Sequence, residues 1–216
     1  MATTYFEQTG FVSNSTLKDL GRSLSVDESF NPNLQKIFDF GSLIDAYTTD
    51  KTEVEKYEQL FDEDEKQKAK LMSQACESDT VFAMLLSTCK TQHEIYRNSF
   101  EFTHDGYTLT LPVRIKLDFF KRPVLAGDLK TTASETMKAF YEALYFFDYD
   151  QQSALYMDVA RVDRFMFVGV GKKKKHGKHP IFKYAVQRGD EMYESGKKKY
   201  SYLMFKYYFL IHNLNL

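Results

Sequence analysis

The chain has 216 residues, 43% of them hydrophobic and 16% aromatic, and its 29 Lys and Arg against 30 Asp and Glu give a formal net charge of −1. This apolar content allows a sizeable core, and without a long Gly, Pro or Ser linker or a repeat we expect one domain over residues 1–216. No apolar run could span a bilayer and residues 1–4 show no signal-peptide pattern, which argues against membrane and secreted proteins and favours a cytoplasmic one.

The first predicted elements are an acidic helix and two isolated cysteines. Residues 50–65 mix Glu, Asp and Lys at helical spacings, which is typical of a solvated helix. Cys76 and Cys89 follow, and with His93 they would supply too few ligands for structural zinc, which needs four. We therefore expect buried free thiols in a reducing compartment.

A β-hairpin is predicted near the middle of the chain. Residues 113–118 alternate apolar and polar side chains, as in a strand with one buried face, and residues 124–130 resume an extended apolar pattern. The interruption between them centres the turn near Pro123. Asp118, on the polar face of the first strand, should then lie opposite Asp128 on the second, at about 5 Å.

This hairpin should place reactive side chains on one face. Asp128 and Lys130 are two residues apart and share that face, whereas Leu129 points the other way into the core. Two carboxylates suit Mg²⁺, which also takes water and phosphate oxygens and can polarise a phosphodiester. Lys130 would position the attacking water or offset charge in the transition state. The alternative is a surface hairpin whose charged groups are merely solvated.

Two helices are expected after the hairpin. The first should begin at once, because Thr132 and Glu135 have the spacing of a capping box. Asp150 can cap the second helix, on which Gln152 and Tyr156 share a face and could point together at a phosphate or a base. The core-facing stripe of the first helix consists of Met137, Phe140, Tyr141, Leu144 and Phe147.

Positive charge is concentrated near the end of the sequence. Residues 1–160 carry 16 Lys and Arg against 26 Asp and Glu, whereas residues 161–216 carry 13 against 4. Such a region attracts backbone phosphates, although lysines also protect the edges of sheets. The apolar segments 165–170 and 181–186 predict a second hairpin, and its lysine-rich tip includes Lys172, Lys173, Lys174 and Lys175.

A helix is predicted to close the chain. Residues 197–199 are all lysine and precede residues 200–212, whose density of Tyr, Phe and Leu suggests a helix packed on a sheet. Together, the predicted elements indicate an α/β domain with a central mixed β-sheet flanked by helices. The hairpin that carries Asp118, Asp128 and Lys130 should lie at its catalytic edge.

Three segments in combination resemble the PD-(D/E)XK nuclease superfamily, which has a restriction-endonuclease-like core: Leu117-Asp118, Gly127 to Thr132, and Tyr149 to Tyr156. A first acid, a D-x-K tripeptide and a Gln-x-x-x-Tyr helix in this order are most similar to the branch containing the RecE exonuclease (exodeoxyribonuclease VIII). The RecB nuclease domain and lambda exonuclease look like more distant relatives. Residues 12–18 resemble the opening segment of the family and residues 40–46 its first core helix, so the similarity covers most of the chain.

The resemblance implies a metal site. Asp118 and Asp128 would hold one or two Mg²⁺ ions, or Mn²⁺, with the help of the Leu129 carbonyl. Many relatives place a histidine ligand where this chain has Asp45, and an oxygen ligand suits these ions at least as well, so Asp45 joins the predicted ligands; the alternative is a helix-surface acid. Some relatives bind an iron-sulfur cluster through four cysteines, but this chain has only two, so no cluster is expected.

The resemblance also implies hydrolysis of DNA, by analogy with RecE as a 5′-to-3′ exonuclease in phage or mobile-element recombination. Gln152, Tyr156 and the lysine-rich tip would contact the DNA. A single-strand annealing protein and further copies of the chain are the other implied partners, with no membrane, in the host cytoplasm if the source is a phage. Two alternatives stay open: a non-catalytic DNA-binding or assembly protein, and a structure-specific endonuclease that would cut closed circles.

Overall fold

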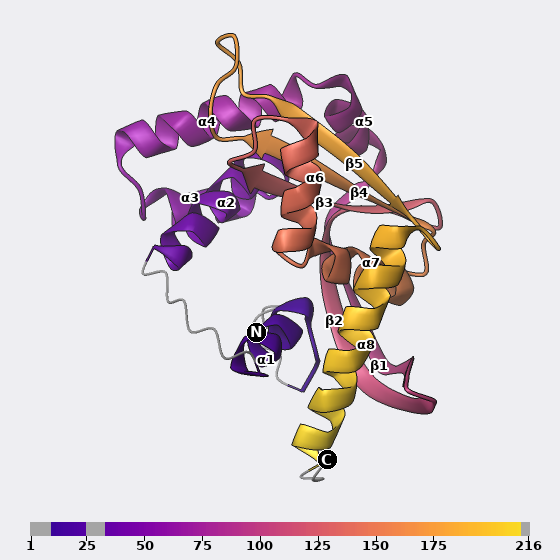
Figure 1. Ribbon diagram of the computed structural model, residues 1–216. Helices are drawn as coiled ribbons and strands as arrows, with labels where there is room; N and C mark the ends of the chain where they lie inside the picture. Colours follow the sequence, from indigo (N-terminus) through magenta and orange to yellow (C-terminus); the bar gives the residue numbers. More distant parts are fainter. Residues whose placement is uncertain (1–9, 25–32, 213–216) are drawn as a thin grey trace.

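The structure is a computed structural model that describes residues 10–24 and 33–212, and it consists of one five-stranded sheet with helices on both faces (Figure 1). Its strands lie in chain order across the sheet and are antiparallel except for the parallel pair β3 and β4. They are β1 (Lys90–His104), β2 (Tyr107–Lys121), β3 (Leu125–Thr132), β4 (Arg164–Gly171) and β5 (Ile181–Gln187). The predicted mixed α/β fold is therefore confirmed.

The helices come mainly before the sheet and around its parallel pair of strands. The early elements are α1 (Asn14–Leu24), α2 (Leu34–Thr48), the 3₁₀ turn η2 (Lys51–Glu53), α3 (Val54–Glu58), α4 (Glu63–Glu77) and α5 (Thr80–Thr88). Parallel neighbours need a long crossover, and here α6 (Met137–Phe146) and α7 (Tyr149–Ala160) carry the chain from β3 to β4. The last helix, α8 (Glu191–Ile211), follows β5. Across the described residues no helix is both long and apolar enough to cross a membrane.

The sheet has a hydrophobic core on each side, because successive residues of a strand face opposite layers. Phe120 packs into the core shared with α1, α6, α7 and α8, whereas its neighbour Phe119 packs into the core shared with α2, α4 and α5. Leu129 of β3 belongs to the second core, as predicted. Asp128 and Lys130 consequently face the side of the sheet on which α7 lies.

The central hairpin forms in the predicted register. The observed pairs Phe119↔Gly127 and Lys121↔Leu125 place the turn around Pro123, and beyond them the Asp118 carboxylate accepts a hydrogen bond from the backbone N–H of Leu129. Gly127 is required by the close approach of β4, since a Cβ there would lie 2.7 Å from a backbone oxygen. Strands β4 and β5 likewise form the predicted second hairpin.

The start of α6 differs from the prediction. Strand β3 continues to Thr132, whose side chain bonds to Ser134, and Glu135 forms an ion pair with Lys173 at 2.6 Å. Neither is therefore available for a capping box, and the helix begins at Met137 with Thr136 as its N-cap. The predicted core stripe is only partly buried, because Phe147 at its end is 53% exposed and lies at the mouth of a cavity.

The start of α7 also differs from the prediction. Its N-cap is Asp148, in a left-handed backbone conformation without a side-chain cap, and not Asp150. Asp150 lies two residues further on, in the first turn of α7, where it is fully buried and accepts hydrogen bonds from Ser195 at 2.7 Å and Lys199 at 3.1 Å. The carboxylate predicted to cap one helix instead joins α7 to α8.

Three smaller expectations need correction. Helix α8 begins at Glu191, so residues 197–199 lie inside it and do not precede it. Residues 50–65 form η2, α3 and the first turn of α4 instead of one helix, because Asp62 and Glu65 make a capping box that starts a new helix. Both cysteines are free, but only Cys76 is fully buried, where burial raises the pKa of its thiol to about 12.

Candidate active site

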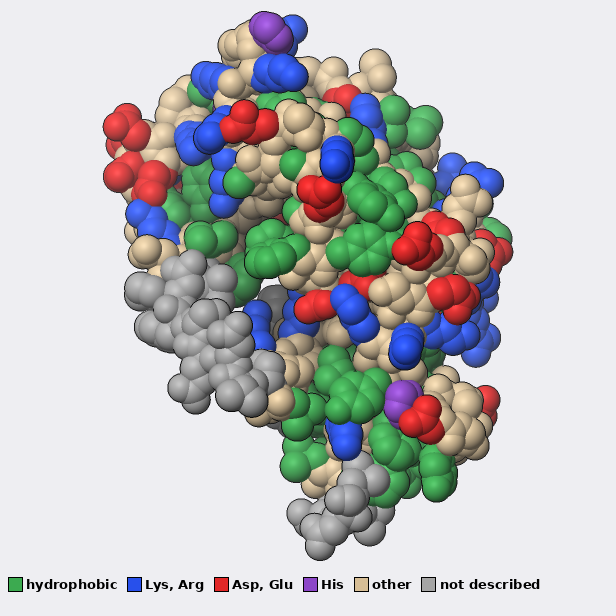
Figure 2. Space-filling model, in the orientation of Figure 1, with side chains coloured by type: hydrophobic (Ala, Val, Ile, Leu, Met, Phe, Trp, Pro, Cys, Tyr) green, Lys and Arg blue, Asp and Glu red, His purple; other side chains and the backbone are tan. Residues whose placement is uncertain are grey.

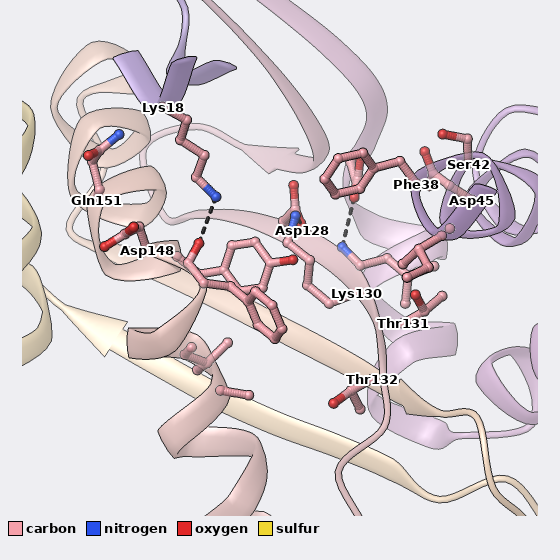
Figure 3. Close-up of a pocket in the computed structure, with 18 of the residues that line it drawn as sticks. Lys18, Phe38, Ser42, Asp45, Asp128, Lys130, Thr131, Thr132, Asp148 and Gln151 are labelled. Atoms are coloured by element: carbon pink, nitrogen blue, oxygen red, sulfur yellow. Dashed lines mark hydrogen bonds and ion pairs between the residues drawn. The ribbon is translucent and has the colours of Figure 1, made fainter. Parts of the chain in front are cut away.

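A cavity of about 1210 Å³ lies over β3 and is lined by segments from the whole chain. On the face shown in Figure 2 the molecule is hollowed near its centre, where Lys and Arg side chains lie among hydrophobic ones. In Figure 3, Lys18 reaches the cavity from one side and Asp45 of α2 from the other, with Asp128 and Lys130 between them. The lining includes all the predicted catalytic and metal-binding residues: Asp45, Asp118, Asp128, Leu129 and Lys130.

Asp128 and Lys130 form a buried ion pair. Asp128 is 5% exposed, and its Oδ1 accepts a hydrogen bond from Gln152 Nε2 at 2.9 Å. Its Oδ2 lies against the Lys130 ammonium and accepts no further hydrogen bond from the described residues. Burial by itself would lower the pKa of Lys130, but Asp128 and Tyr149 outweigh it and hold that pKa above its usual range. Lys130 is therefore a fixed cation, suited to donate hydrogen bonds and not to act as a base.

Asp45 and Asp118 converge on one amide group. Gln92 Nε2 donates to Asp45 Oδ2 at 2.9 Å and to Asp118 Oδ1 at 3.2 Å, while Asp118 Oδ2 accepts from the backbone N–H of Leu129 at 2.7 Å. Burial, reinforced by Asp45 and Asp128, raises the pKa of Asp118 well above its usual value, and burial raises that of Asp45 to about 6. The cavity thus contains carboxylates that resist ionisation unless a cation accompanies them.

These oxygens suit a divalent ion in chemical type. Carboxylates and a backbone carbonyl are ligands that Mg²⁺ and Mn²⁺ accept, with waters filling the remaining positions. The partly unsatisfied Oδ2 of Asp128 and the convergence of Asp45 and Asp118 both fit such an ion. Among the described side chains, however, no three from His, Cys, Asp or Glu form a ready-made cluster. The acids therefore meet in pairs and not in threes. That all the predicted ligands bind one metal site together stays a prediction.

Lys18 is a cavity residue to which the sequence pattern assigned no role. Its Nζ donates to the carbonyl oxygen of Phe147 at 2.7 Å and lies 4.7 Å from the centre of the Tyr149 ring. Burial and then the nearby charge of Lys130 lower the pKa of Lys18 to about 8. Gln92 was missed as well. Each lies far along the chain from the acids it accompanies, so no spacing in the sequence could have revealed either.

The predicted DNA-contacting residues lie in different environments. Gln152 binds Asp128, whereas Tyr156, one turn later, is 8% exposed and packs near Phe165 in the core. Of the four lysines in the predicted tip, Lys172 lines the cavity and Lys173 pairs with Glu135. The other two, Lys174 and Lys175, are exposed on the projecting hairpin, where Lys and Arg side chains gather in Figure 2.

Comparison with known proteins places the fold. No protein-family model matches the sequence, and no curated protein sequence is significantly similar to it. A crystal structure described as a “putative exonuclease” from Eubacterium rectale is similar, with a TM-score of 0.68 and 16% identity over 100% of this chain and 89% of that one. The crystal structure of SSO0001 is much less similar, with a TM-score of 0.37 and 14% identity over 88% of this chain and 84% of that one. The first likeness shows that this chain has the same fold as that nuclease-like protein.

Proposed function

We propose that the protein is a metal-dependent deoxyribonuclease that hydrolyses phosphodiester bonds, and that it acts as an exonuclease on DNA ends. The observation that carries the proposal is that Asp118, Asp128 and Lys130 line one cavity, at the site that the D-x-K pattern predicts. Likeness in fold to a protein described as an exonuclease supports it. Neither observation alone would be enough, since one fold serves many functions.

The residues of the cavity divide the work of such a reaction. Asp118 and Asp128, with Asp45 and the Leu129 carbonyl, would hold one or two Mg²⁺ or Mn²⁺ ions. When bound, the metal would polarise the phosphodiester and promote deprotonation of the attacking water. Lys130, kept protonated, would orient that water and offset the negative charge that grows on the phosphate.

Two amide side chains hold the acids in place. Gln152 fixes the orientation of Asp128 through one hydrogen bond, and Gln92 holds Asp45 and Asp118 side by side. Such supporting contacts orient the metal ligands. Losing one of them commonly lowers metal affinity or activity by about 10–100-fold.

The order of the first acid, the D-x-K tripeptide and the Gln-x-x-x-Tyr helix supports a more specific proposal. The protein would belong to the RecE-like branch, degrade DNA from 5′ to 3′, act in phage or mobile-element recombination, and share its DNA substrate with a single-strand annealing protein. Ring-forming relatives make an oligomer part of the same proposal. Exposed lysines on the β4–β5 hairpin support contact with DNA, because phosphates attract them regardless of sequence.

The test uses end-labelled linear duplex DNA and closed circular DNA, each with Mg²⁺, Mn²⁺ or EDTA. Lys130→Ala and Asp128→Ala should abolish metal-dependent loss of linear DNA, whereas Lys138→Ala, at a side chain that is 86% exposed, should not. Loss of linear DNA alone supports the exonuclease. Cutting of circles would instead favour an endonuclease, and binding without cleavage would favour a non-catalytic DNA-binding protein.

A further inference from the structure

Helix α4 carries three lysines in different electrostatic situations. Lys66 and Lys70 are each paired with a glutamate, at 2.7 and 3.2 Å. Lys68 lies between them in sequence and has no carboxylate partner among the described residues. Its Nζ instead lies 5.9 Å from the centre of the Phe40 ring on α2. The helix therefore presents one uncompensated ammonium beside two compensated ones.

A second uncompensated ammonium meets the same ring. Lys172, which follows β4, has its Nζ 5.9 Å from the centre of the Phe40 ring as well, and it too lacks a carboxylate partner in the described part of the chain. Its neighbour Lys173 is paired with Glu135 at 2.6 Å. Burial, and then the charge of Lys68, lower the pKa of Lys172, so the two ammonium groups are close enough to repel each other.

Such an arrangement favours a bound anion. Attraction of each cation to the ring offsets part of the repulsion but leaves both charges unneutralised. A phosphodiester carries one negative charge and offers two oxygens, each able to accept a hydrogen bond from an ammonium group. One phosphate between Lys68 and Lys172 would turn their repulsion into two attractions.

Lys172 lines the catalytic cavity, and Lys68 meets it at the Phe40 ring. The backbone N–H of Lys172 donates to Thr132 O at 2.8 Å, which puts Lys172 at the end of the strand that carries Lys130. Along β3, Thr132 is two residues or roughly 7 Å from Lys130, and the rise of a nucleotide step is about 3.4 Å, so the proposed phosphate would be a near neighbour of the scissile one. In Figure 1 the β4–β5 hairpin projects beside α4, so the two lysines lie on neighbouring elements.

We propose that Lys68 and Lys172 bind a backbone phosphate one or two nucleotides from the scissile bond. The DNA strand would then pass out of the cavity between α4 and the β4–β5 hairpin. This inference rests on the proposed function, since it presumes a nucleic-acid substrate. Free phosphate or a terminal phosphate offers the same chemistry, and the experiment separates these sources.

The experiment measures DNA binding in EDTA, where hydrolysis does not interfere, by fluorescence anisotropy over a range of salt concentrations. Lys68→Gln and Lys172→Gln should each weaken binding several-fold and reduce the slope of log K against log salt by about 0.7–0.9. Lys66→Gln and Lys70→Gln are matched controls on the same helix. Both should leave the slope unchanged, because their charges are already paired.

Three results would overturn the inference. Unchanged slopes in Lys68→Gln and Lys172→Gln would show that neither residue contacts a phosphate. Equal losses in the control variants would show a diffuse surface field in place of a site. An effect confined to oligonucleotides with a terminal phosphate, or competition by millimolar inorganic phosphate without any effect on DNA, would assign the lysines to another phosphate. The binding assay needs no cleavage. A protein that binds DNA without hydrolysing it would therefore contradict the proposed function, but the assay would still test the phosphate site.

Discussion

Asp45→Asn is expected to stabilise the metal-free protein at neutral pH. Burial raises the pKa of Asp45 from 3.8 to about 6, so between these values the folded protein binds its proton more tightly than the unfolded chain does. The contribution of Asp45 to stability is therefore fully present below about pH 4, is lost as the pH rises to about 6, and is absent at pH 7. An asparagine has no proton to lose and avoids this cost.

The size of the effect follows from the shift. The rise in the pKa of Asp45 from 3.8 to about 6 corresponds to a loss of at most about 3 kcal/mol in the free energy of unfolding at neutral pH. Asp45 is only partly buried, and an asparagine would lose one of the hydrogen bonds from Thr49 and Gln92, so we expect a net gain of about 1–2 kcal/mol. For a chain of this size that is an increase of roughly 3–6 °C in Tm.

The assay is thermal and urea unfolding in EDTA from pH 4 to 8, with Asp105→Asn in an exposed turn as the control. The gap between variant and wild type should open between pH 4 and 6 and stay constant above. Adding Mg²⁺ should raise the Tm of the wild type more than that of the variant. A variant less stable than wild type at pH 7 would refute the burial argument, and an equal response to Mg²⁺ would remove Asp45 from the ligands.

Three further predictions concern the cavity and its walls. Lys18→Met should raise Tm at pH 7 and weaken cleavage. Because the pKa of Lys18 is lowered to about 8, the difference in stability between variant and wild type should shrink as the pH rises from 8 toward 10. A difference that stays constant over this range would contradict the prediction. Gln152→Leu should reduce cleavage about 10–100-fold with an unchanged circular dichroism spectrum, since it frees the Asp128 carboxylate. Gly196→Ala should cost about 2–4 kcal/mol in urea unfolding, because the new Cβ would lie 2.0 Å from a backbone oxygen of α7, whereas Gly21→Ala, with its nearest atom at 3.6 Å, should be tolerated.

The elements that were predictable from the sequence depend on local alternation or local spacing. The β2–β3 and β4–β5 hairpins join neighbouring segments, so their patterns were enough to place them. Strand β1 was not predicted. It is an edge strand with a bulge between Arg97 and Phe100 and is largely half-exposed, so its side chains lack a clean apolar face. Helix α7 was predicted, but it is buried on nearly all sides and so has no amphipathic pattern that could fix its start.

The candidate site divides in the same way. Asp118, Asp128 and Lys130 lie on the two strands of one hairpin, whose turn was predictable from the sequence. The position of the α6 start depended on the pairing of Glu135 with Lys173, which a local capping pattern does not show. The contacts of Lys18 and Gln92 depend on how distant elements pack. Whether Asp45 binds a metal stays a prediction.

The walls of the cavity have a consequence for how such a protein can diversify. The reactive hairpin is central in the sequence, while Lys18 of α1 and Lys199 of α8 close the cavity from segments near the two ends. In the proposed nuclease, the reactive hairpin and the ends of the substrate channel are thus encoded by separate stretches. Exchanging the terminal helices would then change which DNA structure is accepted without altering any residue of the hairpin, and shortening either end would weaken substrate binding in a molecule whose acids are all intact.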